Sequence, residues 1–461
     1  MQSSTDIRPT FQRSFGNITG RIITPNDSAY DEARTVFYGG IDKRPSAIIR
    51  VANTDDVRRV VSIARDDGLE LAVRSGGHSI VGHSTTNGGI VLDLQALSNI
   101  DIDLRTGTAW AQTGATALQF CAAADKHGVA VGFGDAGSVG IGGITLGGGI
   151  GYLTRKFGLT IDSLLAAEVV TADGRVLQAD PDTHADLFWA IRGGGGNFGV
   201  ATRFEFRLHE MREFTGGILI LPATPEIIAR YVAAAVAGPD ELSSIANVMP
   251  APPLPFLPKE QHGRLVIFAM LGYAGDNESA KRAIAPFREL ATPLADMVQP
   301  KPYPEMYPPE DHSMHPKAVS RTMFLDTFDI TAAETMMDFL SSSDAAMRVA
   351  QIRVLGAAVG RVPNDATAYA FRSKAMIVNV AAFYEGLEDR EARKAWAAKF
   401  AAALQPNENG AYVNFLMEEG EAHTHAAYPG PTWERLRQVK AKYDPTNLFR
   451  LNHNIPPAER P

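Results

Sequence analysis

Hydrophobic and polar positions divide the chain into segments of helical and of strand periodicity. Residues 53–68 (NTDDVRRVVSIARDDG) predict a helix that begins at the cap Thr54 and ends at Gly68. Apolar residues recur on one face of this helix: Val57, Val60, Val61 and Ala64. Short apolar runs at 70–74 (ELAVR) and 90–94 (IVLDL) predict strands.

The pattern changes after about residue 210. Before it, residues 164–180 predict two strands joined by an Asp-Gly turn, so residues 1–210 are α+β with short strands and glycine turns. Over 211–405, proline-rich loops separate strand-like runs (GRLVIFAML, AMIVNVAAFY) from helical ones (ATPEIIARYVAAAVAG). We therefore expect a second domain over 211–405, followed by a return to tight, motif-like sequence over 406–461.

Composition narrows the class of protein. The 461-residue chain has a formal net charge of −8 and no basic block, which argues against nucleic acid or an anionic membrane as a partner. It lacks an apolar run of about 18 residues and a signal-like start, so we expect a soluble, cytoplasmic protein. The single cysteine, Cys121, is expected to be a small core residue on a helical face with Leu118 and Ala122.

Three glycine-rich turns lie within residues 74–199. Two stretches, 132–137 (GFGDAG) and 194–199 (GGGNFG), match G-x-G-x-x-G, but neither has both the strand before and the helix after that a Rossmann fingerprint needs. Because backbone N–H groups in such turns approach phosphates closely, we expect a diphosphate cofactor held in an extended conformation between the turns. Glycines that serve tight packing alone are the alternative.

Two histidines, His78 and His83, follow the strand at 70–74 in the segment RSGGHSIVGHS. The glycines already allow the turn, so the imidazoles indicate chemistry, since histidine is mostly neutral near pH 7 and nucleophilic. No metal site is predicted, because two further histidine pairs lack a clear third ligand: His312 with His315, and His423 with His425.

Four longer motifs resemble the berberine-bridge-enzyme-like flavoproteins of the p-cresol methylhydroxylase and vanillyl-alcohol oxidase superfamily. They are RSGGHS (74–79), GSVGIGGITLGGGIGYLTRKFGLTIDSLLAAEVVTADG (137–174), DLFWAIRGGGGNFGV (186–200) and YDPTNLFRLNHNIPP (443–457). The resemblance implies an α+β fold with a two-part FAD-binding domain formed by 1–210 and 406–461. It also implies that residues 211–405 form a substrate domain, whose antiparallel sheet is covered by helices and roofs the isoalloxazine ring.

In relatives, the histidine of RSGGH bonds covalently to the 8α-methyl carbon of FAD, a role that falls here to His78. Many relatives attach FAD a second time through a cysteine, but the matching position here is Ala136. The resemblance therefore implies a single covalent bond and a smaller substrate than the oligosaccharides of doubly attached relatives. It also implies these further FAD contacts: Arg74, Ser75, Gly76, Gly77, Ser79, His83, Ser84, Gly137, Ser138, Gly142, Gly143, Thr145, Gly148, Gly149, Val200, Asn452 and Asn454.

A second departure from the family concerns the general base. Relatives often carry Y-x-N-Y on a strand facing the flavin, whereas this chain has YVNF, which keeps Tyr412 and Asn414 but ends in Phe415. Tyr412 stays a candidate; a neutral amine would need no strong base for hydride transfer, but an alcohol would. Ile144 replaces a histidine that some relatives place beside the ring. Strands of the second domain offer candidate substrate contacts, each equally compatible with packing: Tyr369, Arg372 and Tyr384.

Val139 bears on the electron acceptor. In the resembling family this position lines the space where O₂ meets the reduced flavin, and valine goes with oxidases while bulkier residues go with dehydrogenases. We therefore expect an FAD-dependent oxidase that takes hydride from a small alcohol or amine of natural-product or alkaloid type and releases H₂O₂. A dehydrogenase with another acceptor, a carbohydrate oxidase and a non-enzymatic flavin-binding protein are the alternatives.

Overall fold

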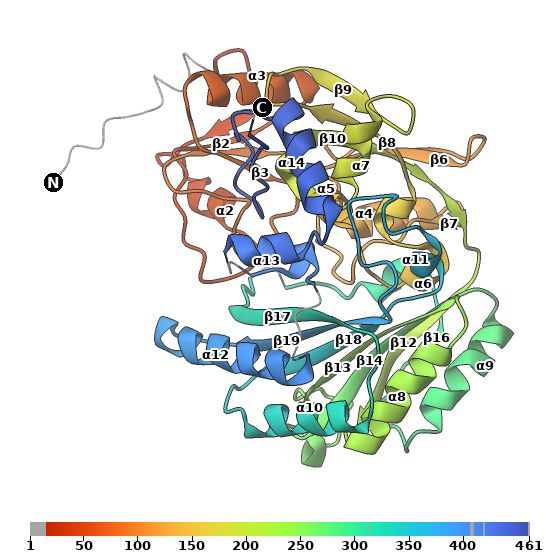
Figure 1. Ribbon diagram of the computed structural model, residues 1–461. Coiled ribbons are helices and arrows are strands. Elements are labelled where there is room, and N and C mark those ends of the chain that lie inside the picture. The colour runs from red at the N-terminus through yellow and green to blue at the C-terminus, as the bar shows by residue number, and fades with distance from the viewer. Residues whose placement is uncertain (1–14, 312, 406–409, 418–419, 460–461) are drawn as a thin grey trace.

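The computed structural model describes residues 15–311, 313–405, 410–417 and 420–459 of the chain. Figure 1 shows two regions: an upper one that holds the N-terminal elements together with the C-terminal helices, and a lower one built on a large sheet. Helices and mainly antiparallel sheets occur together, which confirms the α+β class. Among the described residues, no helix is long and apolar enough to cross a membrane.

A four-stranded sheet of order β1-β2-β4-β3 comes from the start of the chain. Both β2 and β3 run parallel to β4. The predicted helix at 53–68 is confirmed, but Asn53 rather than Thr54 caps it, because the Asn53 side chain accepts the backbone N–H of Asp56. The elements are β1 (Arg21–Ile23), α2 (Tyr30–Arg34), β2 (Ala47–Arg50), α3 (Thr54–Asp66), β3 (Leu71–Arg74) and β4 (Ile90–Asp93).

A five-stranded antiparallel sheet of order β5-β6-β10-β8-β9 follows, and its β8–β9 pair is the predicted hairpin. Cys121 is buried as expected, but Leu118 is exposed, because the buried face of its helix is formed by Ala117, Phe120, Cys121 and Ala124. The elements are β5 (Ile100–Asp103), β6 (Thr108–Gln112), α4 (Ala117–Asp125), β7 (Val129–Ala130), α5 (Ile141–Gly147), α6 (Thr154–Phe157), η1 (Thr160–Asp162), β8 (Leu164–Val170), β9 (Val176–Ala179), α7 (Ala185–Ile191), η2 (Gly195–Asn197), β10 (Val200–Arg207) and β11 (His209–Glu210).

The large eight-stranded antiparallel sheet has the order β15-β12-β14-β13-β18-β19-β17, with β16 beside β12. Its strands are β12 (Phe214–Pro222), β13 (Leu242–Pro250), β14 (Leu265–Ala274), β15 (Ala295–Asp296), β16 (Gln299–Pro300), β17 (Ala318–Leu325), β18 (Arg348–Val354) and β19 (Met376–Phe383). Helices cover the lower face of this sheet in Figure 1: α8 (Pro225–Ala237), α9 (Asn277–Arg288), α10 (Ile330–Ser342) and α12 (Leu387–Leu404). The strands expected in GRLVIFAML and AMIVNVAAFY and the helix expected at 223–238 are confirmed as β14, β19 and α8. Short helices lie between these elements: η3 (Lys259–Gln261), η4 (Tyr303–Met306) and α11 (Ala358–Arg361).

The C-terminal elements return to the N-terminal region (Figure 1). They are η5 (Val413–Phe415), α13 (Glu421–Ala426) and α14 (Pro431–Tyr443). The ammonium group of Lys440 anchors the segment that follows α14. It lies 2.6 Å from the carboxylate of Asp444 and donates to the backbone carbonyls of Asn197 and Phe449. The segment after α14 is thereby held against the glycine turn around Asn197.

Candidate active site

A cavity of about 580 Å³ lies between the glycine-rich turns, the C-terminal segment and the helix-free face of the large sheet. One face of the sheet lines the cavity and the other packs against helices, because successive side chains of a strand point to opposite faces. On β18, Gln351 and Arg353 line the cavity, whereas Ala350 and Ile352 pack in the core under the helices.

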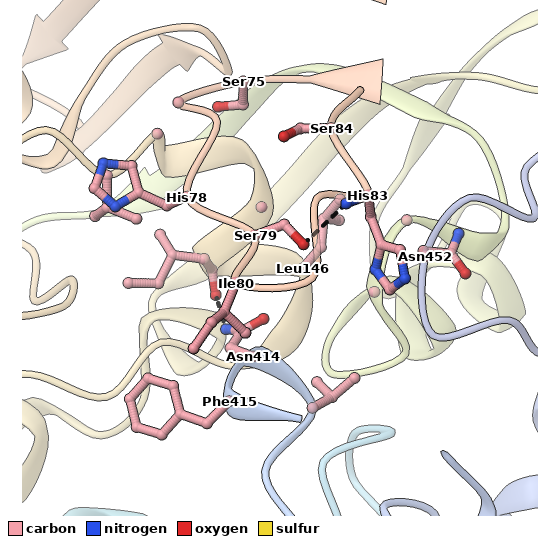
Figure 2. A pocket seen from close by; sticks show the side chains of 18 of the residues that line it. Ser75, His78, Ser79, Ile80, His83, Ser84, Leu146, Asn414, Phe415 and Asn452 are labelled. Atoms are coloured by element: carbon pink, nitrogen blue, oxygen red, sulfur yellow. Dashed lines mark hydrogen bonds between the residues drawn. The ribbon is translucent and has the colours of Figure 1, made fainter. Parts of the chain in front are cut away.

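His78 enters this cavity from the loop that follows β3 (Figure 2). Its ring stacks on Phe37 with 4.1 Å between ring centroids, and its Nε2 lies 2.7 Å from the hydroxyl of Ser138. Burial lowers the pKa of His78 to about 4, against the opposing charges of Glu310 and Asp135. The imidazole is therefore neutral at physiological pH.

Close backbone approach fixes the loop that carries His78. A Cβ atom on Gly140 would lie 2.1 Å from the hydroxyl of Ser75 and 2.2 Å from the backbone nitrogen of Gly76. Any other residue at Gly140 would force the two glycine turns apart, which is the packing reason for glycine at this position.

His83 and His453 face each other on another side of the cavity. Their rings meet edge to face with 4.9 Å between centroids, and the hydroxyl of Ser79 accepts the backbone N–H of His83 (Figure 2). Burial lowers the pKa of His83 to about 3 and that of His453 to about 4, so both rings are neutral. Near them, Ser84 Oγ and Asn452 Oδ1 are buried and have no hydrogen-bond partner among the described residues.

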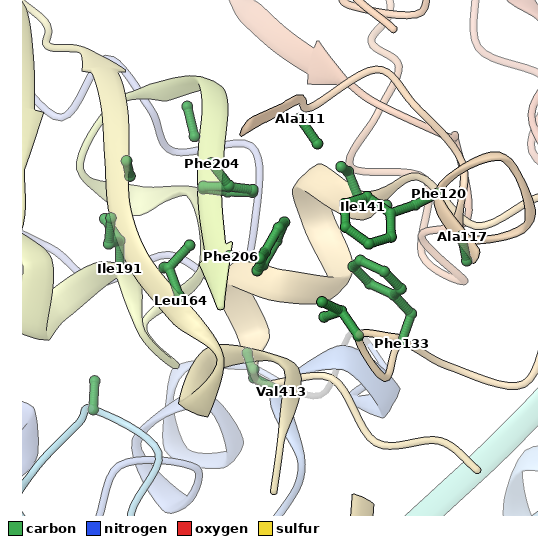
Figure 3. Close-up of a cluster of buried hydrophobic side chains, with 14 of the residues drawn as sticks. Ala111, Ala117, Phe120, Phe133, Ile141, Leu164, Ile191, Phe204, Phe206 and Val413 are labelled. Carbon is green, nitrogen blue, oxygen red and sulfur yellow. The ribbon is translucent and has the colours of Figure 1, made fainter. Parts of the chain in front are cut away.

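Tyr412 and Asn414 lie where η5 meets helix α5. The Tyr412 hydroxyl oxygen accepts the Gly149 N–H at 2.9 Å and the Asn414 side-chain N–H at 2.9 Å, and Asn414 also donates to the Ile144 carbonyl. Between them, Val413 packs into the buried cluster of Figure 3, which anchors the turn. Burial raises the pKa of Tyr412 to about 12 despite these hydrogen bonds, so the phenol keeps its proton at neutral pH.

A polar row crosses the sheet face above the cavity. The Thr322 hydroxyl donates to Asn379, and the Gln351 amide donates to Asn247, each at 2.9 Å. Beside this row, Arg353 donates to Gln351 at 2.8 Å and to the carboxylate of Asp135 at 2.7 Å. The Arg353 guanidinium also lies 4.9 Å from the centroid of the Phe415 ring. These groups can orient a polar substrate, and Phe415 supplies an apolar surface.

Comparison with known proteins identifies the family. A family model described as an FAD binding domain matches residues 45–180, and one described as berberine and berberine like matches residues 411–456. (R)-6-hydroxynicotine oxidase of Paenarthrobacter nicotinovorans is 30% identical over 455 residues, 96% of this chain and 97% of that relative. The chain belongs to the berberine-bridge-enzyme-like FAD-linked oxidoreductases.

Two further similarities agree with this assignment. The crystal structure of 6-hydroxy-D-nicotine oxidase from Arthrobacter nicotinovorans matches with a TM-score of 0.84 at 29% identity, covering 96% of this chain and 98% of that one. Glucooligosaccharide oxidase of Sarocladium strictum is 27% identical over 92% of this chain and 90% of that relative. The expected resemblance, fold and FAD-linked oxidoreductase class are thereby confirmed.

The cavity suits FAD, the cofactor of this family. Its wall carries two buried oxygens, Ser84 Oγ and Asn452 Oδ1, without a partner in the part of the chain that the structure describes, and a ribityl or phosphate group would satisfy them. The glycine turns supply close backbone approach on the same side. These predicted residues line the cavity: Ser75, Gly76, Gly77, His78, Ser79, His83, Ser84, Val139, Gly142, Gly143, Val200, Tyr412, Asn414 and Asn452.

Other predicted cofactor contacts lie behind the cavity wall. Arg74 is buried and its Nη2 lies 3.0 Å from the carboxylate of Asp93, while its Nε and Nη1 have no hydrogen-bond partner among the described residues. Thr145 Oγ1 and Asn454 Oδ1 are buried without a partner among the described residues, but neither residue lines the cavity. The remaining ones belong to the turns that shape the wall: Gly137, Ser138, Gly148 and Gly149.

The three predicted substrate contacts are not among the residues that line the cavity. Tyr369 and Arg372 lie in a loop rather than in a strand and are buried outside the cavity, where Arg372 forms an ion pair with Asp162 at 2.7 Å. Tyr384 follows the end of β19; its neighbour Phe383 lines the cavity and Tyr384 does not. Asn414 lies in the 3₁₀ turn η5 and Tyr412 directly precedes it, whereas the corresponding motif of relatives was described on a strand.

Several lining residues were missed by the sequence reasoning. On β18 and β19, Gln351, Arg353 and Asn379 are polar residues at alternate positions of otherwise apolar strands, a signal that could have marked them. Asp135 and His453 lie within quoted motifs but carried no separate signal. As for metals, no cluster of three or more ligating side chains occurs among the described residues, and His312 lies outside them.

Proposed function

We propose that this chain is an oxidase that takes hydride from a small alcohol or amine of natural-product or alkaloid type and returns the electrons to O₂ as H₂O₂. FAD, when bound, supplies the hydride acceptor. The observation that carries the proposal is that His78, Val139 and Tyr412 line the same cavity as Gln351 and Asn379 of the polar row on the sheet. We also propose one covalent bond to FAD, through His78, since Ala136 offers no thiol.

Different walls of the cavity would bind the cofactor and the substrate. Residues 1–210 and 406–461 would hold the cofactor through the glycine turns, Ser84 and Asn452, and 211–405 would hold the substrate. The Tyr412 oxygen accepts two N–H groups, which leaves its own hydrogen available to a substrate heteroatom. Tyr412 would thus orient the substrate as a donor, an arrangement that suits a neutral amine better than an alcohol.

A substrate panel tests the reaction. Amines, aromatic alcohols and oligosaccharides are incubated with the purified protein in air, and peroxide release is measured for each. Peroxide from small amines or alcohols supports the proposal, and peroxide from oligosaccharides alone favours the activity named for the Sarocladium relative. Substrate that bleaches the protein, with colour restored by a dye but not by air, would indicate a dehydrogenase.

Attachment is tested separately by denaturing the protein in acid. The wild-type precipitate should stay yellow and exceed the chain mass by one FAD, and His78→Ala should release all flavin to the supernatant. Cys121→Ser is the matched control, because its thiol is buried in the core outside the cavity. Flavin retained by the His78→Ala protein would reassign the attachment site.

A further inference from the structure

Glu310 closes a chain of hydrogen bonds that begins at His78. One carboxylate oxygen of Glu310 accepts the backbone N–H of Ser138 at 2.9 Å, and the other accepts the Ser138 hydroxyl. The same hydroxyl lies 2.7 Å from His78 Nε2. The three residues come from the loop after β3, the turn before α5 and the loop before β17, which are distant in sequence.

The chemistry of the groups fixes the direction of the chain. A glutamate carboxylate only accepts hydrogen bonds, so the single hydroxyl hydrogen of Ser138 goes to Glu310. The Ser138 oxygen must then accept from His78, which requires the hydrogen of the neutral imidazole to be on Nε2. The second ring nitrogen, Nδ1, therefore carries the lone pair.

We propose that Ser138 and Glu310 are positioning residues for the covalent attachment of FAD. They hold His78 as the Nε2–H tautomer, present Nδ1 as the nucleophile and take up the Nε2 proton as the bond forms. This inference rests on the proposed attachment at His78.

Burial of the ring explains why a proton acceptor is needed. Bond formation at Nδ1 would leave a cationic imidazole, and a buried site disfavours the cation, as the lowered pKa of His78 shows. Stacking on Phe37 also limits the freedom of the ring to turn toward water. Transfer of the Nε2 proton to Ser138, with the Ser138 hydrogen passing to Glu310, restores a neutral ring.

The step balances with dioxygen as oxidant. The Nδ1–C bond to the 8α carbon forms, one C–H bond of the methyl group and the Nε2–H bond break, and two protons leave. The two electrons released are taken up by the cofactor and then by O₂, which with the two protons gives H₂O₂. Ser138 and Glu310 handle only the proton from Nε2.

The test measures the rate of covalent attachment apart from FAD affinity. Full-length protein made under riboflavin limitation is mixed with FAD in air, and samples are acid-precipitated over time. Glu310→Gln should attach FAD at least about tenfold more slowly, a small part of what acid–base help typically supplies, because the neutral amide cannot take the proton. Its non-covalent FAD affinity, from flavin fluorescence at early times, should match the wild type.

Controls separate this role from a structural one. Glu305→Gln changes an exposed glutamate in the same segment and should attach FAD at the wild-type rate. Ser138→Ala should be slow, and Ser138→Thr, which keeps the hydroxyl, should recover most of the rate. Equal attachment rates in wild type and Glu310→Gln, or equal losses of affinity and rate, would overturn the relay while leaving attachment at His78 intact. Failure of the wild type to attach FAD would instead refute the proposed covalent bond at His78, on which this inference rests.

Discussion

At the scale of the residue, the side-chain volume of Val139 bears on the proposed reaction with O₂. Its side chain lines the cavity and packs against the core cluster, and its carbonyl accepts the Ala117 N–H, so the backbone there is fixed. We predict that Val139→Leu keeps covalent FAD and anaerobic reduction by substrate but reoxidises far more slowly in air. The added methylene would fill space needed by O₂ and strain its neighbours by about 1–3 kcal/mol.

Stopped-flow mixing of substrate-reduced enzyme with aerated buffer measures this reoxidation. Val139→Ala is the matched control, since it enlarges the same space and should reoxidise at least as fast as wild type. Equal reoxidation rates in wild type and Val139→Leu would reduce Val139 to a packing residue.

Tyr412 allows a second prediction at this scale. Removal of its hydroxyl in Tyr412→Phe would leave the buried Gly149 N–H unpaired and take away the donor proposed for the substrate. We expect flavin reduction under anaerobic conditions to slow by roughly tenfold or more, with attachment of FAD intact. A reduction rate within a factor of about two of wild type would remove Tyr412 from the reaction.

At the scale of elements, the apolar periodicity of the sequence predicted the helices and strands whose formation depends on nearby residues. The α3 helix, the β8–β9 hairpin, β14 and α8 each carry their own apolar pattern and turn residues, so the sequence located them. The 3₁₀ turn beside Tyr412 had no local signal, since the hydrogen bond that holds it is remote, from Asn414 to Ile144, 270 positions away. Glu310 escaped notice for the same reason, since its partner Ser138 lies 172 positions earlier.

The C-terminal return offers a further prediction at this scale. Lys440 and Asp444 form a buried ion pair at 2.6 Å with no exposed side-chain surface, and Asp444 also accepts the Leu448 and Phe449 N–H groups. We predict that Lys440→Met destabilises the protein by about 3–5 kcal/mol, because the Asp444 charge stays buried without its partner. The loosened segment carries Asn452 and His453, so FAD affinity should also fall.

Urea unfolding and FAD titration measure both effects. Lys442→Met is the matched control, since Lys442 is exposed on the same helix and pairs with Asp186 at the surface. Stability unchanged in Lys440→Met would mean that the return is held by its apolar contacts alone.

At the scale of the whole molecule, the cavity exists only because three stretches of chain meet. Arg353 of the sheet reaches Asp135 of a glycine turn, and Arg155 donates to the carbonyls of Leu355 at 2.6 Å and Gly238 at 2.7 Å. These contacts couple the N-terminal region to the sheet. Four histidines of the N- and C-terminal parts, His78, His83, His209 and His453, have pKa values lowered by burial, so we expect the stability of the chain to depend on pH.

His209 allows the pH dependence of stability to be tested without a change in the cavity, because it lies outside the cavity. Its ring stacks on Phe157 at 4.3 Å and its Nε2 lies 2.9 Å from the Ser163 hydroxyl. Burial, helped by the charges of Arg207 and Lys156, lowers the pKa of His209 from 6.5 to about 4.

Below about pH 6.5 the unfolded chain therefore binds a proton at His209 that the folded chain does not, and stability is lost as the pH falls toward 4. The loss from one such group is at most about 1.4 kcal/mol per pH unit. We predict that His209→Gln, which can keep a hydrogen bond to Ser163, lowers stability at pH 7 but makes its decline between pH 6.5 and 4 shallower. Urea unfolding of both proteins at pH 7, 6 and 5 measures this difference, and a constant gap between them would show that His209 does not titrate differently on folding.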